Sequence, residues 1–461
     1  MKPAAIALLV VKTAVRSRLL QCLAAILLFI LVVMPLAVEG DGTAAGRARV
    51  LLEYTLGMSV AVLIAGALVF SCGAVAREIE ERHIQLLAVK PVRAAQVWLG
   101  KWIGLLLINA LLLAMVGVFV YGGIRWTLRS GRYSEAERAQ TGEELLIARR
   151  LIVPVAEDVT AEAAARLAQL PAGAAEADPE RREALLRMLG RRILAERATV
   201  APGGSKTWVF RLPADIGTGR RARLRFRLAP TIEPGLISGS WRLESPPSSE
   251  GVTVSMGDAL ANGGYIDVPD ENVSAPGTLR VVFRNGTAGQ TGTAVFDIEE
   301  GLELLVNAGG FEANLLRSLF VLFCRLALLS ALGLTAGCVF SSPVAGFLCV
   351  SIIVVAMMGH YVTVQSVNDI QAPHAEDAGG GERSRLAVFL QNAGESMVKR
   401  TAVVVEPVAN LNPLGPLADG LLVSWAFAGR ALVLLGVVYP GVLGAAGVWA
   451  LWKRELALPG D

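Results

Sequence analysis

The sequence predicts an α-helical polytopic membrane protein with six transmembrane helices and an inserted extracytoplasmic α+β domain. Of its 461 residues, 54% are hydrophobic and only 18% are charged, whereas soluble domains carry about 25% charged residues. The apolar residues gather in two blocks, and the segment between them alternates polar and apolar residues like a β-rich domain. The net charge of +3 gives no support to nucleic-acid binding.

The two apolar blocks accommodate six spans, because a transmembrane helix needs about 20 apolar residues. The first membrane block covers residues 1–122 and the second covers 315–461. We expect the first span to be a retained anchor and not a cleaved signal peptide, since further spans follow it. The predicted spans are residues 19–37, 58–75, 102–121, 318–340, 344–362 and 431–452.

Basic residues near the span ends predict the orientation, because cytoplasmic loops are enriched in Lys and Arg. The N-terminal segment, the loop at residues 76–101 and the C-terminus share such residues. Six spans place all three on one side, so both termini are expected in the cytoplasm. Residues 123–314 and the loop 365–428 then lie outside. Ala- and Arg-rich usage and a cysteine-free outer segment favour the plasma (inner) membrane of a bacterium.

The inserted domain is predicted to be helical over residues 123–200 and β-rich over 205–305. Residues 221–228 read RARLRFRL, an alternation typical of a half-buried strand with arginines on its wet face. Evenly spaced strand-like runs follow, and Asn285-Gly286 is a hairpin signal. We expect a β-sandwich or jelly roll. The arginines could form a face for an anionic ligand, although a solvated strand face is the simpler interpretation.

Motifs for catalysis, metals and cofactors are missing from the sequence. His83, His360 and His374 have no metal-ligand spacing, and no nucleophile or zinc motif is found. Residues 203–207 resemble a phosphate-binding loop, but Ser205 stands where that loop requires Gly. We therefore expect no enzyme activity, no cofactor and no nucleotide site in this chain.

The loop between the second and third spans is the most informative segment. Acidic residues stand at the start of a short helix and Lys90 at its end, which suits the helix dipole. Pro91 then stops the helix. The resulting amphipathic helix either lies on lipid or docks a cytoplasmic partner. The residues expected to form this docking element are Glu78, Glu80, Glu81, Ile84, Leu86, Leu87, Lys90, Pro91 and Arg93.

This loop resembles the cytoplasmic loop of type-2 ATP-binding-cassette (ABC) permeases. That family reads an acidic start, Ile-x-x-Leu-Leu, Lys-Pro-Val-x-Arg and Leu-Gly-Lys; here Arg93 comes one place early and Leu99-Gly100-Lys101 closes the loop. The Ser341-Ser342-Pro343 turn, the Asn410–Pro413 segment and the basic N-terminal helix also fit. The resemblance covers both membrane blocks. The large extracytoplasmic insertion departs from the family and leaves the substrate open.

The resemblance implies the permease subunit of an ABC exporter. A separate cytoplasmic ABC ATPase subunit would hydrolyse ATP, and a second permease copy or paralogue would complete the assembly in the lipid bilayer. The outer domain could bind an extracytoplasmic ligand or envelope protein. A second hypothesis is an ATP-driven mechanical or assembly protein that moves this domain without transporting a substrate. A sensor or scaffold without an ATPase is a third, which the loop disfavours.

Arg325 is predicted to lie within the fourth span. An intramembrane charge is costly and usually faces a protein interior or a partner. Glu53, near the outer start of the second span, is one candidate partner. Alternatively, the span starts later and Arg325 reaches toward the membrane surface.

Overall fold

A computed structural model shows two compact units, one formed by residues 1–147 and 310–461 and the other by 148–309. Each is described by itself. The described residues are 3–38, 42–80, 93–129, 133–135, 137–138, 141–142, 146–169, 179–214, 221–228, 237–245, 248–259, 264–270, 273, 277–286, 292–298, 300–354 and 410–453.

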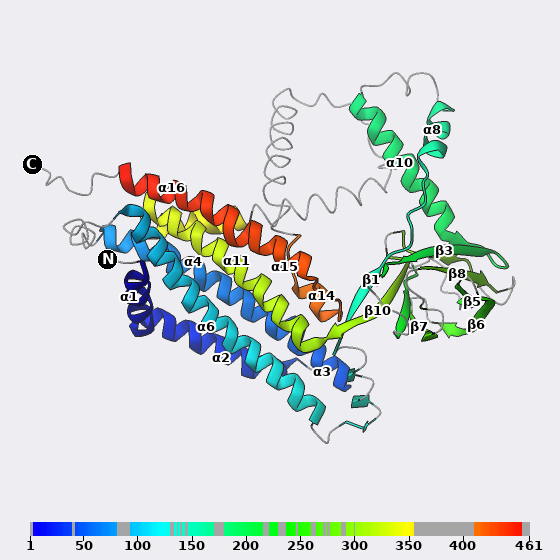
Figure 1. Cartoon of the computed structure of the whole chain (residues 1–461), viewed down its shortest axis with the longest axis horizontal. Coiled ribbons are helices and arrows are strands. Elements are labelled where there is room, and N and C mark those ends of the chain that lie inside the picture. Colours follow the sequence, from blue (N-terminus) through cyan, green and yellow to red (C-terminus); the bar gives the residue numbers. More distant parts are fainter. Residues whose placement is uncertain are drawn as a thin grey trace, which may run out of the picture. The chain divides into compact units, whose positions relative to one another are not determined.

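The first unit is a helical bundle (Figure 1). Its described helices are α1 (Pro3–Arg16), α2 (Arg18–Ala37), α3 (Ala44–Val50), η1 (Leu51–Thr55), α4 (Leu56–Glu80), α6 (Ala94–Arg129), α11 (Phe311–Val339), α14 (Leu414–Ala418), α15 (Trp425–Ala431), η4 (Leu432–Val438) and α16 (Tyr439–Lys453). A short apolar helix covers Ser342–Val354.

Five of these helical stretches are long and apolar enough to cross a membrane: Arg18–Ala37, Ala44–Ile79, Ala94–Arg129, Phe311–Val339 and Trp425–Lys453. The structure therefore has five helices that are compatible with a membrane protein of several spans. The other predicted span, residues 344–362, coincides in part with the helix Ser342–Val354, and its remainder lies outside the described residues. The sixth span stays a prediction.

The third membrane helix is longer than its predicted span, residues 102–121. α6 continues through Arg129, so the helix extends into the segment that the sequence assigned to the outer domain. Arg125 supports this extension by donating from Nε to the Tyr121 hydroxyl at 3.0 Å and by pairing with Glu312 of α11. Hydropathy identifies only the apolar part of a helix. Polar side chains such as Arg125 can extend the helix past that part, so the predicted span was shorter than α6.

α11 occupies the centre of the bundle and packs against α4, α6 and α16. Small residues allow its close approach to α4, because a Cβ at Gly337 would lie 2.5 Å from the Cys72 carbonyl oxygen. Buried polar side chains bond between helices: Asn109 of α6 donates to the Ser330 hydroxyl of α11 at 2.9 Å. Such interhelical bonds satisfy polar groups that lipid cannot.

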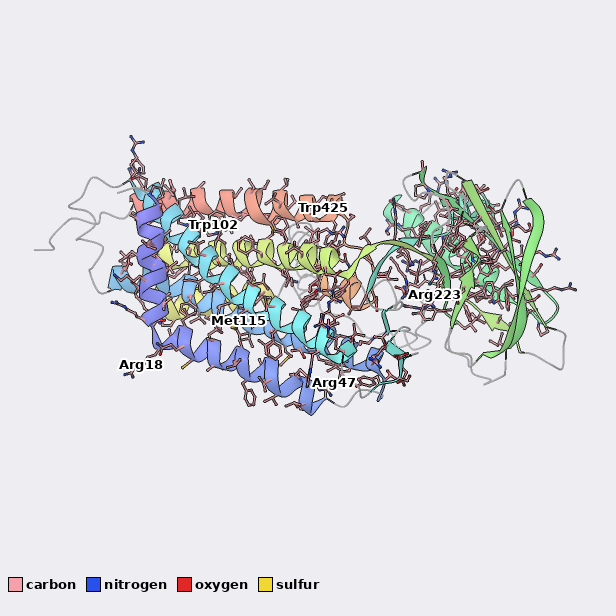
Figure 2. The ribbon with its side chains drawn as sticks, turned by 60° about the horizontal axis from the view of Figure 1, so that its bottom comes forward. Arg18, Arg47, Trp102, Met115, Arg223 and Trp425 are labelled. Atoms are coloured by element: carbon pink, nitrogen blue, oxygen red, sulfur yellow. The ribbon has the colours of Figure 1, made fainter. Side chains whose placement is uncertain are left out.

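α1 lies across one end of the bundle (Figure 2). Its contact with α6 is close because two glycines face it: a Cβ at Gly100 would come within 2.7 Å of Ile6, and one at Gly104 within 2.8 Å of Val10. Ser17 separates α1 from α2 and caps α2 by accepting from the Leu20 amide. An N-terminal helix with this crossing geometry suits the membrane surface.

The second unit contains two four-stranded antiparallel sheets, ordered β1-β10-β4-β7 and β3-β8-β5-β6, and the short pair β2-β9. The strands are β1 (Ile147–Ile152), β2 (Thr199–Val200), β3 (Ser205–Leu212), β4 (Ala222–Phe226), β5 (Ile237–Ser245), β6 (Ser248–Ala259), β7 (Gly264–Val268), β8 (Gly277–Asn285), β9 (Ala294–Val295) and β10 (Leu302–Gly310). Helices α8 (Thr160–Ala168) and α10 (Pro179–Ala198) pack together.

One aromatic core joins the two sheets of this unit. The Trp241 ring of β5 is fully buried and lies 5.3 Å from Phe226 of β4 and 4.7 Å from Phe283 of β8 between ring centroids. Separate antiparallel sheets are thus observed, while the jelly-roll connectivity stays a prediction.

Two local expectations were wrong. Within the segment predicted as helical, residues 123–200, α8 and α10 agree with the prediction, but residues 147–152 form β1. The pairing of β1 with β10 buries Ala148 and Ile152, and a partner strand of this kind overrides local propensity. Asn285-Gly286 does not join two paired strands, since β8 pairs with β3 and β5 while β9 pairs with β2. The Asn285 side chain instead donates to the Val200 and Gly292 carbonyls, both at 2.9 Å.

Candidate functional site

The predicted docking loop is described only at its two stems. Glu78 and Glu80 belong to the last turn of α4, and Arg93 immediately precedes α6. Arg93 caps the start of α6 by accepting at its carbonyl from the Gln96 amide at 2.8 Å. The other predicted site residues, Glu81, Ile84, Leu86, Leu87, Lys90 and Pro91, lie outside the described residues.

A partly buried ion pair joins the two stems. The Lys101 Nζ of α6 lies 2.6 Å from the Glu78 Oε1 of α4, and the Lys101 side chain is 3% exposed while that of Glu78 is 36% exposed. The same ammonium donates to the Ala74 carbonyl. Lysine is almost never fully buried unless it is paired, so Lys101 ties the start of α6 to the end of α4.

Apolar packing fixes the same two stems to the last membrane helix. Val75 of α4, Trp98 of α6 and Leu451 of α16 belong to one buried cluster. The Trp98 ring fits against two glycines of α16, since a Cβ at Gly444 would lie 2.9 Å from the ring and one at Gly447 would lie 2.6 Å from it. Because both the ion pair and this apolar packing hold the ends of the loop, these ends must move together with α4, α6 and α16.

A cavity of about 480 Å³ opens beside the ion pair, between α1, α2, α4 and α6. Its walls are mainly apolar, and Arg77, Glu78 and Lys101 line its charged end. The Glu78 Oε2 atom is buried and has no hydrogen-bond partner among the described residues. The junction of the loop with the membrane helices is therefore incompletely packed, which leaves room for movement.

The sequence placed Lys101 in the Leu-Gly-Lys motif and among the basic residues of the loop, but its ion pair with Glu78 was not predicted. The signal was present, because Lys101 is a charged residue between Val97 and Leu105, which are buried on a similar face of α6. A charge at such a position needs a partner, and Glu78 is the acid at the corresponding depth of the preceding helix.

Arg325 lies at the middle of α11, between Cys324 and Leu326, which are both buried. Its own side chain is half-buried. Within the described residues no carboxylate pairs with it. Glu53, the proposed partner, is exposed in η1 and forms no ion pair with Arg325, so that pairing was wrong. α11 itself begins at Phe311, but the helix bounds do not fix the depth of Arg325 in a membrane, so the alternative that Arg325 reaches toward the membrane surface stays a prediction.

The alternating arginines of β4 are paired within their own sheet (Figure 2 labels Arg223). Arg223 lies 2.6 Å from Asp267 of β7, and the buried Arg225 lies 2.5 Å from Glu303 of β10. Arg227 pairs with Glu300. Carboxylates of the neighbouring strands neutralise Arg223 and Arg225, and Glu300, just before β10, neutralises Arg227, which favours a structural role over an anionic-ligand face.

Among the described residues, no group of three or more His, Cys, Asp or Glu side chains is arranged so that it could hold a metal ion. Cys72 and Cys349 lie 3.9 Å apart between sulfur atoms and are both free thiols. Their burial among apolar side chains is typical of packing residues.

Comparison with known proteins finds no match to any protein family, to any curated protein or to any solved structure.

Proposed function

We propose that this chain is the permease subunit of an ABC exporter, in which a separate ATPase drives the membrane helices through the loop between α4 and α6. The observation that carries this proposal is the pair between the buried Lys101 and the partly exposed Glu78, which links the two stems of that loop to each other. A loop whose stems are fixed to each other transmits a displacement of its tip to both α4 and α6. A loop with unlinked stems would deform instead, and the helices would not move.

The proposed path of motion runs from the loop through α4 to α11. α4 and α11 are closely packed at Gly333, which lies against the Ser71 side chain, and at Gly337, which lies against the Cys72 backbone. Rigid packing of this kind transmits displacement. ATP binding can shift the arrangement only if the ATPase contacts the loop differently in the two states, so the contact at Leu86 and Leu87 is the proposed point of control.

The remaining parts of the proposal follow the same layout. A second copy or a paralogue pairs with this chain in the membrane, the residues 355–362 complete a sixth span, and the sheets of residues 148–309 form a sandwich-like outer domain. The plasma membrane of a bacterium, with both termini in the cytoplasm, is the proposed location.

A second candidate function is ATP-driven movement of the outer domain on an envelope partner, without transport. One observation favours it: β10 ends at Gly310 and α11 begins at Phe311, with no linker between strand and helix. A shift of α11 along its axis therefore reaches β10 through a single peptide bond.

Affinity purification from native membranes tests the proposal. We expect a chain with nucleotide-binding motifs to copurify and to hydrolyse ATP. Its rate should respond to a transported substrate in the exporter and to an envelope protein in the mechanical device. Recovery of the intact chain without any ATPase, under conditions that preserve membrane complexes, would contradict both.

A further inference from the structure

A second cavity, of about 450 Å³, lies between α6, α11 and α15 at the end of the bundle where α11 begins. Its walls are almost entirely apolar and include Ala110 and Leu113 of α6 together with Phe320 and Phe323 of α11. Arg317 and Trp425 are also part of the lining. An apolar space of this size suits an alkyl chain.

Arg317 provides the charged group at this cavity. The residue is only 8% exposed, and its Nε donates to the Ala313 carbonyl at 3.0 Å. Its guanidinium carbon lies 5.5 Å from the centroid of the Trp425 ring. Among the described residues no carboxylate pairs with Arg317, and the acid nearest in sequence, Glu312, is engaged by Arg125 at 2.9 Å. Burying a guanidinium without a carboxylate partner costs free energy, and a bound anion would lower this cost.

Trp425 indicates the depth of this guanidinium in the membrane. The residue is 74% exposed at the start of α15 (labelled in Figure 2). Exposed tryptophans of membrane proteins concentrate at the level of the lipid headgroups. Arg317, in contact with this ring, thus lies at the depth of the lipid phosphates, with the apolar cavity beside it.

We propose that this cavity is a binding site for an anionic phospholipid, with the phosphate on Arg317 and one acyl chain between α6 and α11. Charge complementarity identifies the occupant: arginine binds phosphate through paired N–H donors, and the walls offer the tail an apolar surface. The site requires only that the helices lie in a bilayer, so it does not depend on the exporter proposal.

Quenching of Trp425 fluorescence by brominated lipids measures occupancy at the site. The protein is reconstituted in phosphatidylcholine vesicles, and phosphatidylglycerol or phosphatidylcholine with brominated acyl chains is titrated in. The Trp425 signal is the difference between the wild type and Trp425→Phe. We expect phosphatidylglycerol to quench at about fivefold lower mole fraction, the preference that one basic residue gives for an anionic lipid.

Four variants decide the interpretation. Arg317→Gln should abolish the preference and Arg317→Lys should keep most of it. Arg129→Gln, which removes the same charge from an exposed position at the end of α6, should leave it unchanged. Ala110→Leu, which fills the cavity and keeps every charge, should weaken quenching by both lipids.

Equal quenching by the two lipids in the wild type would overturn the proposal, as would an equal effect of Arg317→Gln and Arg129→Gln. If Arg317→Gln does not fold, Arg317→Lys and Ala110→Leu still decide: unchanged quenching in Ala110→Leu would refute the site. None of these readings requires an ATPase, so failure here leaves the exporter proposal standing.

Discussion

The Glu78–Lys101 pair allows a quantitative test of the idea that the loop stems are locked. At the observed 2.6 Å separation, the Coulomb attraction is about 6 kcal/mol with an effective dielectric constant of about 20. Glu78→Gln removes this attraction and leaves the ammonium buried. Breaking a buried pair costs about 3–5 kcal/mol, and the partial exposure of Glu78 allows some hydration, so we expect a loss near 3 kcal/mol, the low end of that range.

The reverse change should cost less. Lys101→Met leaves a carboxylate that is 36% exposed and can reach water, and Met fills much of the lysine volume. We expect a loss of about 1 kcal/mol, and a similar loss in the double variant, because replacing both charges by uncharged groups is often nearly neutral. The resulting double-mutant cycle gives a coupling energy of about 3 kcal/mol.

The free energy of unfolding in mixed detergent micelles is the measured quantity. The exposed pair between Arg125 and Glu312, at 2.9 Å with side chains 47% and 56% exposed, serves as the matched control. Its cycle should give a much smaller coupling energy, because solvent screens an exposed pair. A coupling energy for Glu78 and Lys101 no larger than that of the control would refute the argument that this pair locks the stems.

Three further predictions concern the outer unit and the N-terminal helix. Trp241→Ala should destabilise a fragment spanning residues 146–310 by about 3–5 kcal/mol in urea unfolding, whereas Tyr265→Ala, at a position 58% exposed, should cost under about 1 kcal/mol. The Arg197 guanidinium, 2.8 Å from Glu157, holds the pKa of that carboxyl below its usual 4.5. This pair therefore stabilises the fragment above pH 4.5, and its contribution to the free energy of unfolding is lost as the pH falls through the lowered pKa. Glu157→Gln should make the free energy of unfolding fall less steeply with decreasing pH. An unchanged pH profile in this variant would contradict the pairing. Gly100→Leu should lift α1 from α6 and lower the thermal unfolding midpoint of the whole chain in detergent, and an unchanged midpoint would argue against this close contact.

Hydropathy and alternation predicted the large features because burial leaves a strong pattern in sequence. The apolar runs identified the five described membrane helices, and the alternation at residues 221–228 identified β4, where Ala222, Leu224 and Phe226 are buried as expected. The expectation of a wet arginine face was wrong at Arg225, which is buried against Glu303. Alternation distinguishes two faces of a strand but does not reveal whether a neighbouring strand supplies a counter-charge.

Features that depend on partners distant in sequence could not be predicted. β1 forms because β10, more than a hundred residues later, pairs with it. The same limit applies to the site: Glu78 and Lys101 were both noticed, but their contact requires α4 and α6 to be side by side. The contact between Arg317 and Trp425 could not be predicted either, since nothing in the local sequence of either residue indicates that the two approach each other.

ATP hydrolysis in the complex tests the central claim most directly. The chain is purified with its ATPase in lipid nanodiscs, and the rate is compared with that of the ATPase alone. We predict that the wild-type chain changes the rate and that Leu86→Glu combined with Leu87→Glu returns it to that of the free ATPase. Met188→Glu, which adds charge at an exposed position of the outer unit, should behave like the wild type. A rate that is the same for the wild type and the double variant would contradict coupling through this loop.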